Sequence, residues 1–233
     1  MESLGKNLMI NSKNTKIICV ALLSLMIQLS IIMFAGSYTS SPFASRPTIQ
    51  SADAQVDETF KTYKNPKFGL VLSYPPTWSV DELRKDPAAP ANNSIVAVFK
   101  SPSQGQNDKY LENVIVNIQG PRSDIVSLEH YTQNSLKAFN NLSNIKILNS
   151  SKGTLAGLPA HQLIYTSSAF PGLDLKKMQV FTVVNNNTAY VVTFSGEESQ
   201  YDKSLPEIEK MINSLKIDKN VVKDLIGNKS QTT

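Results

Sequence analysis

Residues 175–195 read LKKMQVFTVVNNNTAYVVTFS, and this stretch decides the fold. Polar and apolar residues alternate across 175–184 and again across 188–195, which is the period of a half-buried β-strand. Three asparagines at 185–187 join the two segments, and asparagine tolerates the left-handed backbone of a tight hairpin turn. The stretch predicts an antiparallel hairpin and therefore favours an antiparallel sheet.

Shorter segments upstream carry the same signal. Those predicted as strands are 68–74, 95–99, 114–118, 145–148 and 160–166. Pro75 and Pro76 end the first of them, because proline cannot donate to a strand ladder. The segment 101–108 holds Pro, Gly, Gln and Asn and predicts a loop, and a turn is expected between Gly153 and Pro159.

Two helices are expected. Ser127 is placed to cap a helix that runs to about Asn140, with Glu129 in its first turn. Ser204 and Glu207 form a capping-box pattern that predicts the start of the second helix. The apolar stripe of this second helix consists of Ile208, Met211, Ile212 and Leu215. Hairpin-linked strands with packed helices predict the α+β class, with a central antiparallel sheet of six or seven strands flanked by helices.

Residues 17–36 form an unbroken run of 20 residues without a charge. As a helix, the run would be about 30 Å long, enough to cross the hydrocarbon core of a bilayer. Three lysines precede it and the next basic residue is Arg46, so the positive-inside rule predicts that residues 1–16 stay in the cytoplasm and the rest is exported. The run is either a retained transmembrane signal anchor or a cleaved signal peptide, and in the second case the protein is secreted.

The rest of the chain divides into three parts. Residues 37–59 are rich in Ser, Thr, Pro and Ala and predict a flexible linker, residues 60–217 form one domain, and residues 218–233 form a polar tail. The only cysteine, Cys19, lies in the apolar run. We therefore expect the exported domain to be held by its core, without a disulfide framework, a thiol nucleophile or a cysteine-based metal site.

The charge argues against one class of partner. The net charge of the chain is +4. The first 54 residues hold four basic and two acidic residues, so the remainder holds 19 basic and 17 acidic residues and a net charge of +2. This gives no basic footprint for nucleic acid and no polybasic cluster for an anionic membrane surface.

Three blocks resemble the PsbP-like domain family. The block 68–78 is a glycine-containing strand that ends in Tyr-Pro and is followed shortly by Trp78. The block 157–165 reads GLPAHQLIY and is similar to the middle strand of the family. The block 179–215 has two strands around a short asparagine turn and a helix that ends Ile-Asn-Ser-Leu, and it is similar to the closing hairpin and C-terminal helix. The resemblance covers about residues 60–217.

The resemblance implies an α-β-α sandwich with a central antiparallel sheet. In oxygenic phototrophs such proteins are extrinsic subunits on the lumenal side of photosystem II, where they help to retain calcium and chloride and have no hydrolase or transferase chemistry of their own. None of their ion-linked residues is matched in this chain, and a membrane anchor departs from the soluble lumenal subunits. The fold is also shared with a nuclear import factor that binds a small GTPase, so the fold alone does not fix the function.

The polar residues show no spacing typical of a metal site. His130 and His161 are the only histidines and are expected on a helix and on a strand, whereas zinc or iron needs three or four ligands. One carboxylate cluster comprises Asp81, Glu82 and Asp86, and a second comprises Glu197, Glu198 and Asp202. Neither cluster has the spacing of a calcium loop. We therefore predict no metal ligand and no cofactor.

Catalytic patterns are equally weak. The chain has no Gly-x-Ser-x-Gly sequence, and Ser195-Gly196-Glu197 is expected in a loop between a strand and a helix. Trp78 is expected to be a core aromatic and not an exposed anchor for a partner. The sequence thus predicts no catalytic residue.

Three functions remain open. The first is a non-catalytic binding or scaffold module, tethered outside the cytoplasm, that docks on a membrane protein complex or binds a small ligand or ion. The second is a hydrolase, which would require His161, Asp174, Glu197 and Ser195 to converge. The third is a structural protein of the cell envelope. A membrane contact through 17–36 and the absence of a nucleic-acid partner are expected in every case.

Overall fold

The computed structural model describes residues 59–82, 93–106, 108–120, 124–125, 127–170 and 173–221. The predicted anchor at 17–36, almost all of the predicted linker and residues 222–233 lie outside these ranges. Within the described ranges, no helix is both long enough and apolar enough to cross a bilayer.

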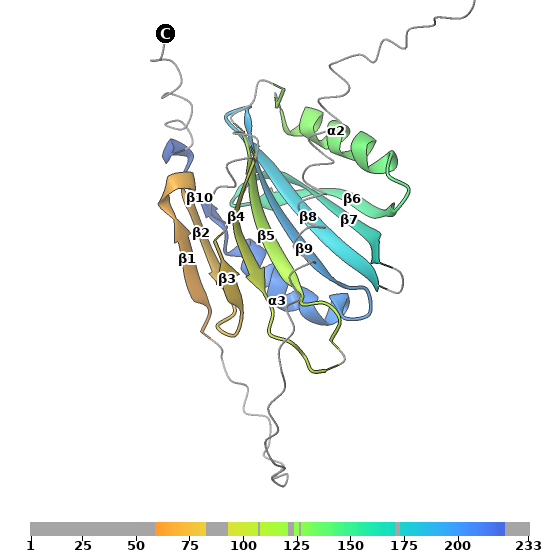
Figure 1. The fold of residues 1–233 in the computed structure, drawn as a ribbon. Helices are drawn as coiled ribbons and strands as arrows, with labels where there is room; N and C mark the ends of the chain where they lie inside the picture. Colours follow the sequence, from red (N-terminus) through yellow and green to blue (C-terminus); the bar gives the residue numbers. More distant parts are fainter. Residues whose placement is uncertain are drawn as a thin grey trace, which may run out of the picture.

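Seven strands form one antiparallel sheet in the order β3-β4-β5-β9-β8-β7-β6 (Figure 1). They are β3 (Ser79–Asp81), β4 (Asn93–Lys100), β5 (Asn113–Gln119), β6 (Ile145–Leu155), β7 (Leu158–Phe170), β8 (Leu173–Val184) and β9 (Thr188–Glu197). The predicted hairpin is β8-β9, and β9 is the central strand of the sheet. The predicted α+β class and the seven-stranded antiparallel sheet are confirmed.

A second sheet of three strands lies beside the first, in the order β1-β2-β10. These strands are β1 (Lys61–Asn65), β2 (Leu70–Tyr74) and β10 (Lys216–Ile217). The prediction that a strand begins at Phe68 is wrong, because Pro66–Phe68 forms a 3-10 turn that Gly69 ends with a φ of 60°. A Cβ at Gly69 would lie 2.8 Å from the Asp218 carbonyl oxygen, so glycine lets the two chain ends of the domain approach.

The first helix, α2 (Leu128–Asn140), begins as predicted. The Ser127 hydroxyl accepts a hydrogen bond of 3.1 Å from the backbone N–H of His130, which satisfies one of the free donors of the first turn. Glu129 lies in this turn, where a carboxylate interacts favourably with the helix dipole.

The second helix, α3 (Tyr201–Asn213), begins three residues before the predicted cap. Ser204 lies inside the helix, where its hydroxyl donates to the Gln200 carbonyl, so the predicted capping box does not form. The earlier start is explained by a tertiary contact. Tyr201 is buried against Phe194 of β9, with ring centroids 5.1 Å apart, so the first turn of the helix packs on the sheet. Pro206 is tolerated inside the helix.

Two further boundaries were predicted wrongly. The turn expected across 153–159 is only Ala156 and Gly157, both with positive φ, because this two-residue turn matches the twist of the long hairpin β6-β7. The strand predicted to end at Ser195 continues through Gly196 and Glu197, which were expected in a loop, and Glu197 pairs with Leu175 of β8.

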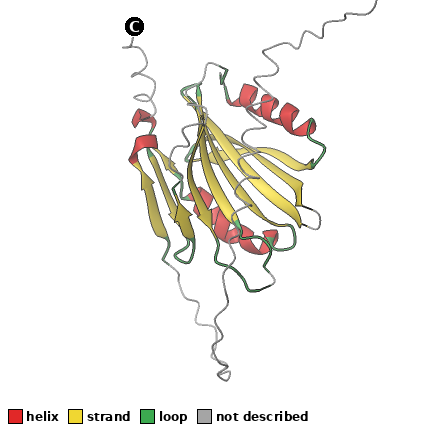
Figure 2. Ribbon diagram, in the orientation of Figure 1, coloured by secondary structure: helices red, strands yellow, loops and turns green. Residues whose placement is uncertain are grey.

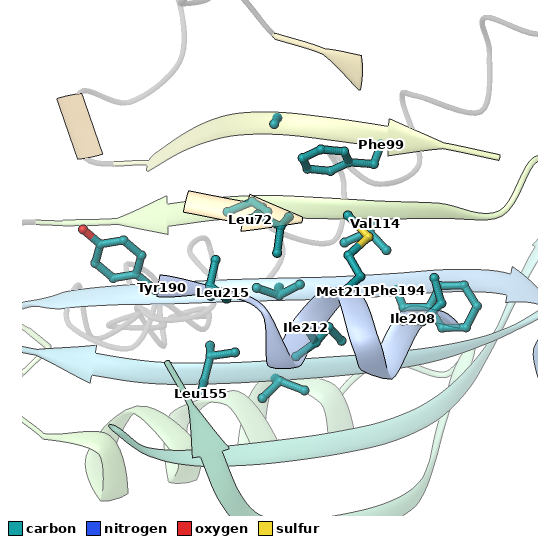
Figure 3. Packing of buried hydrophobic residues seen from close by; sticks show 14 of the residues in the cluster. Leu72, Phe99, Val114, Leu155, Tyr190, Phe194, Ile208, Met211, Ile212 and Leu215 are labelled. Atoms are coloured by element: carbon teal, nitrogen blue, oxygen red, sulfur yellow. The ribbon is translucent and has the colours of Figure 1, made fainter. Parts of the chain in front are cut away.

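The helices lie on opposite faces of the large sheet (Figure 2). We name each face after its helix. The α3 face carries Tyr190, Val192 and Phe194 of β9, which pack with α3 and with the small sheet (Figure 3). Trp78 is 6% exposed in the same cluster, which confirms its predicted place in the core.

The α2 face carries the alternate residues of the same strands. Ala189 and Val191 of β9 pack there with Phe181 and with Phe139 of α2. This second apolar cluster covers only one end of the face, because the next inward positions of β9 are Thr193 and Ser195. The other end of the α2 face is therefore buried and mixed, with polar residues beside apolar ones such as Leu175 and Ile115.

Candidate functional site

The two histidines lie on different elements, as predicted, and do not share a site. His130 of α2 has its ring within 3.3 Å of the Asn134 amide, and His161 of β7 has Nε2 2.8 Å from the Ser150 hydroxyl. Across the described residues, no three His, Cys, Asp or Glu side chains gather as metal ligands would. Glu197, Glu198 and Asp202 are therefore not part of such a group, whereas Asp86 of the other carboxylate cluster lies outside the described residues.

The four residues required by the hydrolase hypothesis are scattered. His161 pairs with Phe181 of β8, whereas Ser195 pairs with Lys177. These two β8 positions are four residues apart, about 13 Å at 3.3 Å per residue. Asp174 accepts a hydrogen bond of 2.7 Å from Ser168 at the end of the hairpin β7-β8, remote from His161. The arrangement gives no nucleophile beside a base.

Ser150 and His161 do form a hydroxyl–imidazole pair of their own. Ser150 is exposed, and among the described residues no carboxylate hydrogen-bonds to the second nitrogen of the imidazole. Burial lowers the pKa of His161, Glu129 opposes this, and Lys152 adds to it. Because no described carboxylate orients the imidazole as a base, the pair lacks the third member of a catalytic triad.

The notable feature is Lys177, a lysine in the middle of the buried α2 face. It is 1% exposed, and the strand register places it between Tyr165 of β7 and Ser195 of β9. Further buried polar residues surround it on the same face. We call the set the polar cluster, and it comprises Tyr110, Asn113, Tyr165, Ser167, Lys177 and Ser195.

Part of the polar cluster is internally hydrogen-bonded. The Asn113 amide donates to the Tyr110 hydroxyl at 2.8 Å and to the Leu111 carbonyl at 3.1 Å. Burial raises the pKa of Tyr110, although hydrogen bonds with Asn113 and Ser195 oppose the shift. Burial also raises the pKa of Tyr165, with a smaller electrostatic contribution from Tyr110.

Three groups of the polar cluster have no partner among the described residues. The hydroxyls of Tyr165 and Ser167 are buried without a hydrogen bond. The Lys177 ammonium makes neither a hydrogen bond nor an ion pair with any described residue, and burial alone lowers its pKa to about 8. Each unpaired hydroxyl costs about 1–3 kcal/mol, and an unpaired buried charge costs more.

Chemically, the unpartnered groups are all hydrogen-bond donors. Lys177 remains largely protonated at pH 7 with a pKa of about 8, and the tyrosine hydroxyls stay neutral because burial raises their pKa values. A positive charge with adjacent hydroxyls suits a negatively charged oxygen ligand.

The sequence did contain a signal for this site. In the strand of alternating residues, Leu175, Lys177, Gln179 and Phe181 share one face. A lysine at an inward position of a central strand is rare unless the charge is paired. The neighbouring lysine made this signal easy to miss, because Lys176 points to the opposite face and pairs with Asp202 at 3.0 Å.

Comparisons with known proteins agree with the resemblance found in the sequence. The family model described as PsbP-like protein matches residues 17–217, which is most of the chain. A search of curated proteins finds no match.

The chain is also similar to solved structures at low sequence identity. The cyanobacterial PsbP of Synechocystis sp. PCC 6803 is 17% identical, with a TM-score of 0.50, and the match covers 73% of this chain and 99% of that one. LpqN of Mycobacterium tuberculosis, described as involved in cell envelope biogenesis, is 16% identical with a TM-score of 0.46. The match covers 68% of this chain and 90% of LpqN. The Ran-binding protein Mog1p of Saccharomyces cerevisiae is 11% identical with a TM-score of 0.47. The match covers 71% of this chain and 99% of Mog1p. The family match over residues 17–217 shows that the chain belongs to the PsbP-like protein family.

Proposed function

We propose that this protein is a non-catalytic binding module, tethered by residues 17–36 to a membrane with its PsbP-like domain outside the cytoplasm. In this role the domain docks on a membrane protein complex or binds a small ligand. Lysines on only one side of the apolar run support this orientation. The family match begins at residue 17, so it includes the apolar run and not only the folded domain.

The polar cluster is the observation that carries the binding role. It keeps Lys177 and two hydroxyls buried without partners, at a cost in stability that an apolar face would avoid. Polar groups that stabilise a fold are normally paired when buried. Unpaired donors are expected where a ligand supplies the missing acceptor.

Membrane topology is the first test. Alkaline phosphatase and a fluorescent protein that folds only in the cytosol would be fused in turn to the C-terminus of the full chain. We expect phosphatase activity and no fluorescence, and mass spectrometry of the mature N-terminus would separate a retained anchor from a cleaved signal. Cytosolic fluorescence without phosphatase activity would refute the proposed orientation.

Docking is tested separately, by affinity capture of the tagged chain from membranes solubilised in a mild detergent. The matched control keeps residues 1–59 and carries an unrelated folded domain in place of residues 60–233. A protein complex that co-purifies at fixed stoichiometry with the full chain, and not with the control, is the expected result. Equal recovery with both chains would show that the PsbP-like domain does not select the partner.

A further inference from the structure

We propose that the polar cluster is a binding site for a small monovalent carboxylate, whose two oxygens accept hydrogen bonds from Lys177, Tyr165 and Ser167. This inference deepens the binding role proposed above and rests on it, since it names the class of ligand. The Tyr165 and Ser167 hydroxyls are buried without a hydrogen bond, and Lys177, which is 1% exposed, forms no ion pair with a described residue.

The strand register brings the three donors together. Tyr165 and Lys177 are directly opposite each other on β7 and β8, and Ser167 is the next residue of β7 on the same face. Opposite residues have Cβ atoms about 4.5–5.5 Å apart, and diagonal neighbours about 7–8 Å. Long side chains from these positions reach a common acceptor, and a carboxylate offers two oxygens with about four acceptor sites.

The local charge favours a monovalent anion. Two carboxylates belong to the surroundings of the site: Glu197, which is on the same face by register, and the buried Glu112, which accepts hydrogen bonds from Ser101 and Gln104. Neither forms an ion pair with Lys177.

Pairing places two more lysines on this face. Lys100 of β4 forms an ion pair with Asp81 at 2.7 Å, and Lys152 of β6 is opposite His161, four residues of β7 away from Tyr165. One unpaired positive charge balances one negative charge, whereas a divalent anion would leave a second buried charge without compensation.

Burial limits the size of the ligand. Lys177 is 1% exposed and Tyr165 is 0% exposed, so the surrounding side chains leave little free surface around either residue. The proposed ligand is therefore a planar group of a few atoms, such as formate or acetate. The apolar cluster under α2 closes one side of the site, where Phe139 packs against the Tyr165 ring with centroids 4.9 Å apart.

The chain supplies a matched control. Lys176 is the preceding residue, but it points to the α3 face, where it pairs with Asp202 and lies over the Tyr201 ring. A Lys176→Met variant therefore removes the same charge from the opposite face. Tyr165→Phe removes one donor of the proposed site and leaves its ring in place.

The experiment uses the full chain in detergent and measures its thermal unfolding midpoint against sodium formate, with sodium gluconate holding the ionic strength constant. The wild type and Lys176→Met should show a midpoint that rises and saturates with formate. Lys177→Met should show no formate response, and Tyr165→Phe should bind formate about tenfold more weakly, as expected for the loss of one hydrogen bond to a charged group.

Two results would overturn the site. One is a saturable formate response in Lys177→Met equal to that of the wild type. The other is a wild-type midpoint that does not change with formate, or changes without saturation. A cytosolic C-terminus in the reporter assay would refute the proposed membrane topology but would not change the formate response. The two proposals can therefore fail separately.

Discussion

The two faces of the seven-stranded sheet are built from the same strands but serve different purposes. On the α3 face, β9 places Tyr190, Val192 and Phe194, all 0% exposed, into a core shared with α3 and the small sheet. On the α2 face, the same strand places Thr193 and Ser195 beside a buried lysine. Strand alternation thus separates the apolar residues that stabilise the fold from the buried polar residues of the proposed site.

The energetic difference between the faces is large. Burial of one large apolar side chain contributes about 1.5–3 kcal/mol. A buried hydroxyl without a partner costs about 1–3 kcal/mol. The α3 face therefore supplies stability, and the polar end of the α2 face reduces it.

The largest loss of stability is expected from a substitution on the α3 face. Phe194→Ala removes a fully buried ring that packs on Tyr201, and it should lower the free energy of unfolding by about 3–5 kcal/mol. The adjacent Ser195→Ala changes the opposite face and should cost about 1 kcal/mol or less. Urea unfolding of both variants measures the difference. Equal losses would contradict the division between the faces.

The second prediction concerns Lys177. Burial lowers its pKa to about 8 in the folded state from an ordinary value of 10.5. Between these pH values the unfolded chain binds more protons, so stability rises with pH. Below pH 8 the buried charge costs about 3 kcal/mol, which follows from the shift at about 1.4 kcal/mol per unit. Lys177→Met should recover up to that amount at pH 7.

The same variant should also lose the increase in stability between pH 8 and 10. The matched Lys176→Met variant should keep this pH dependence, because Lys176 is paired with Asp202 and partly exposed. Urea unfolding at pH 7, 8, 9 and 10 compares the three proteins. A Lys177→Met variant with an unchanged pH slope would show that Lys177 is not a buried, unpaired charge.

The third prediction compares two fully buried tyrosines, one on each face. The Tyr190 hydroxyl donates to the Phe68 carbonyl at 2.8 Å, so Tyr190→Phe leaves that carbonyl without its partner and should cost about 1–2 kcal/mol. The Tyr165 hydroxyl has no partner, so Tyr165→Phe should be neutral or stabilising in the absence of ligand. Chemical unfolding measures both. A larger loss for Tyr165→Phe would reverse the comparison.

The smallest effect is expected outside both faces. Ala156 has a φ of 53° in the β6-β7 turn, a backbone region that asparagine adopts more readily than alanine. Ala156→Asn should therefore raise the unfolding free energy by about 0.5 kcal/mol, and Ala156→Val should lower it because β-branched residues are strained there. Thermal unfolding resolves these differences, and a stabilising valine would exclude this turn geometry.

The sequence predicts the elements whose signal is local. The alternation in 175–195 predicted β8 and β9, and Ser127 predicted the start of α2, because each depends on neighbouring residues alone. The strands β1, β3 and β10 have two to five residues each and were not predicted, since so few positions carry no clear period. Their pairing depends on contacts with residues far along the chain, such as Lys216 of β10 with Val71 of β2.

The start of α3 and the candidate site depend on tertiary contacts. Ser204 and Glu207 fit a capping box locally, but the packing of Tyr201 on Phe194 extends the helix past them. Lys177 carries an inward-facing signal in sequence, yet only the register shows that Tyr165 and Ser195 flank it and that no described carboxylate pairs with it.

The most direct test of the division between the faces is the unfolding free energy of Lys177→Met relative to the wild type at pH 7, without and with saturating formate. If the polar cluster is kept for a ligand, the variant is the more stable protein without formate, and the gap narrows when formate binds the wild type. A variant that is less stable than the wild type under both conditions would show that Lys177 supports the fold and would contradict the account.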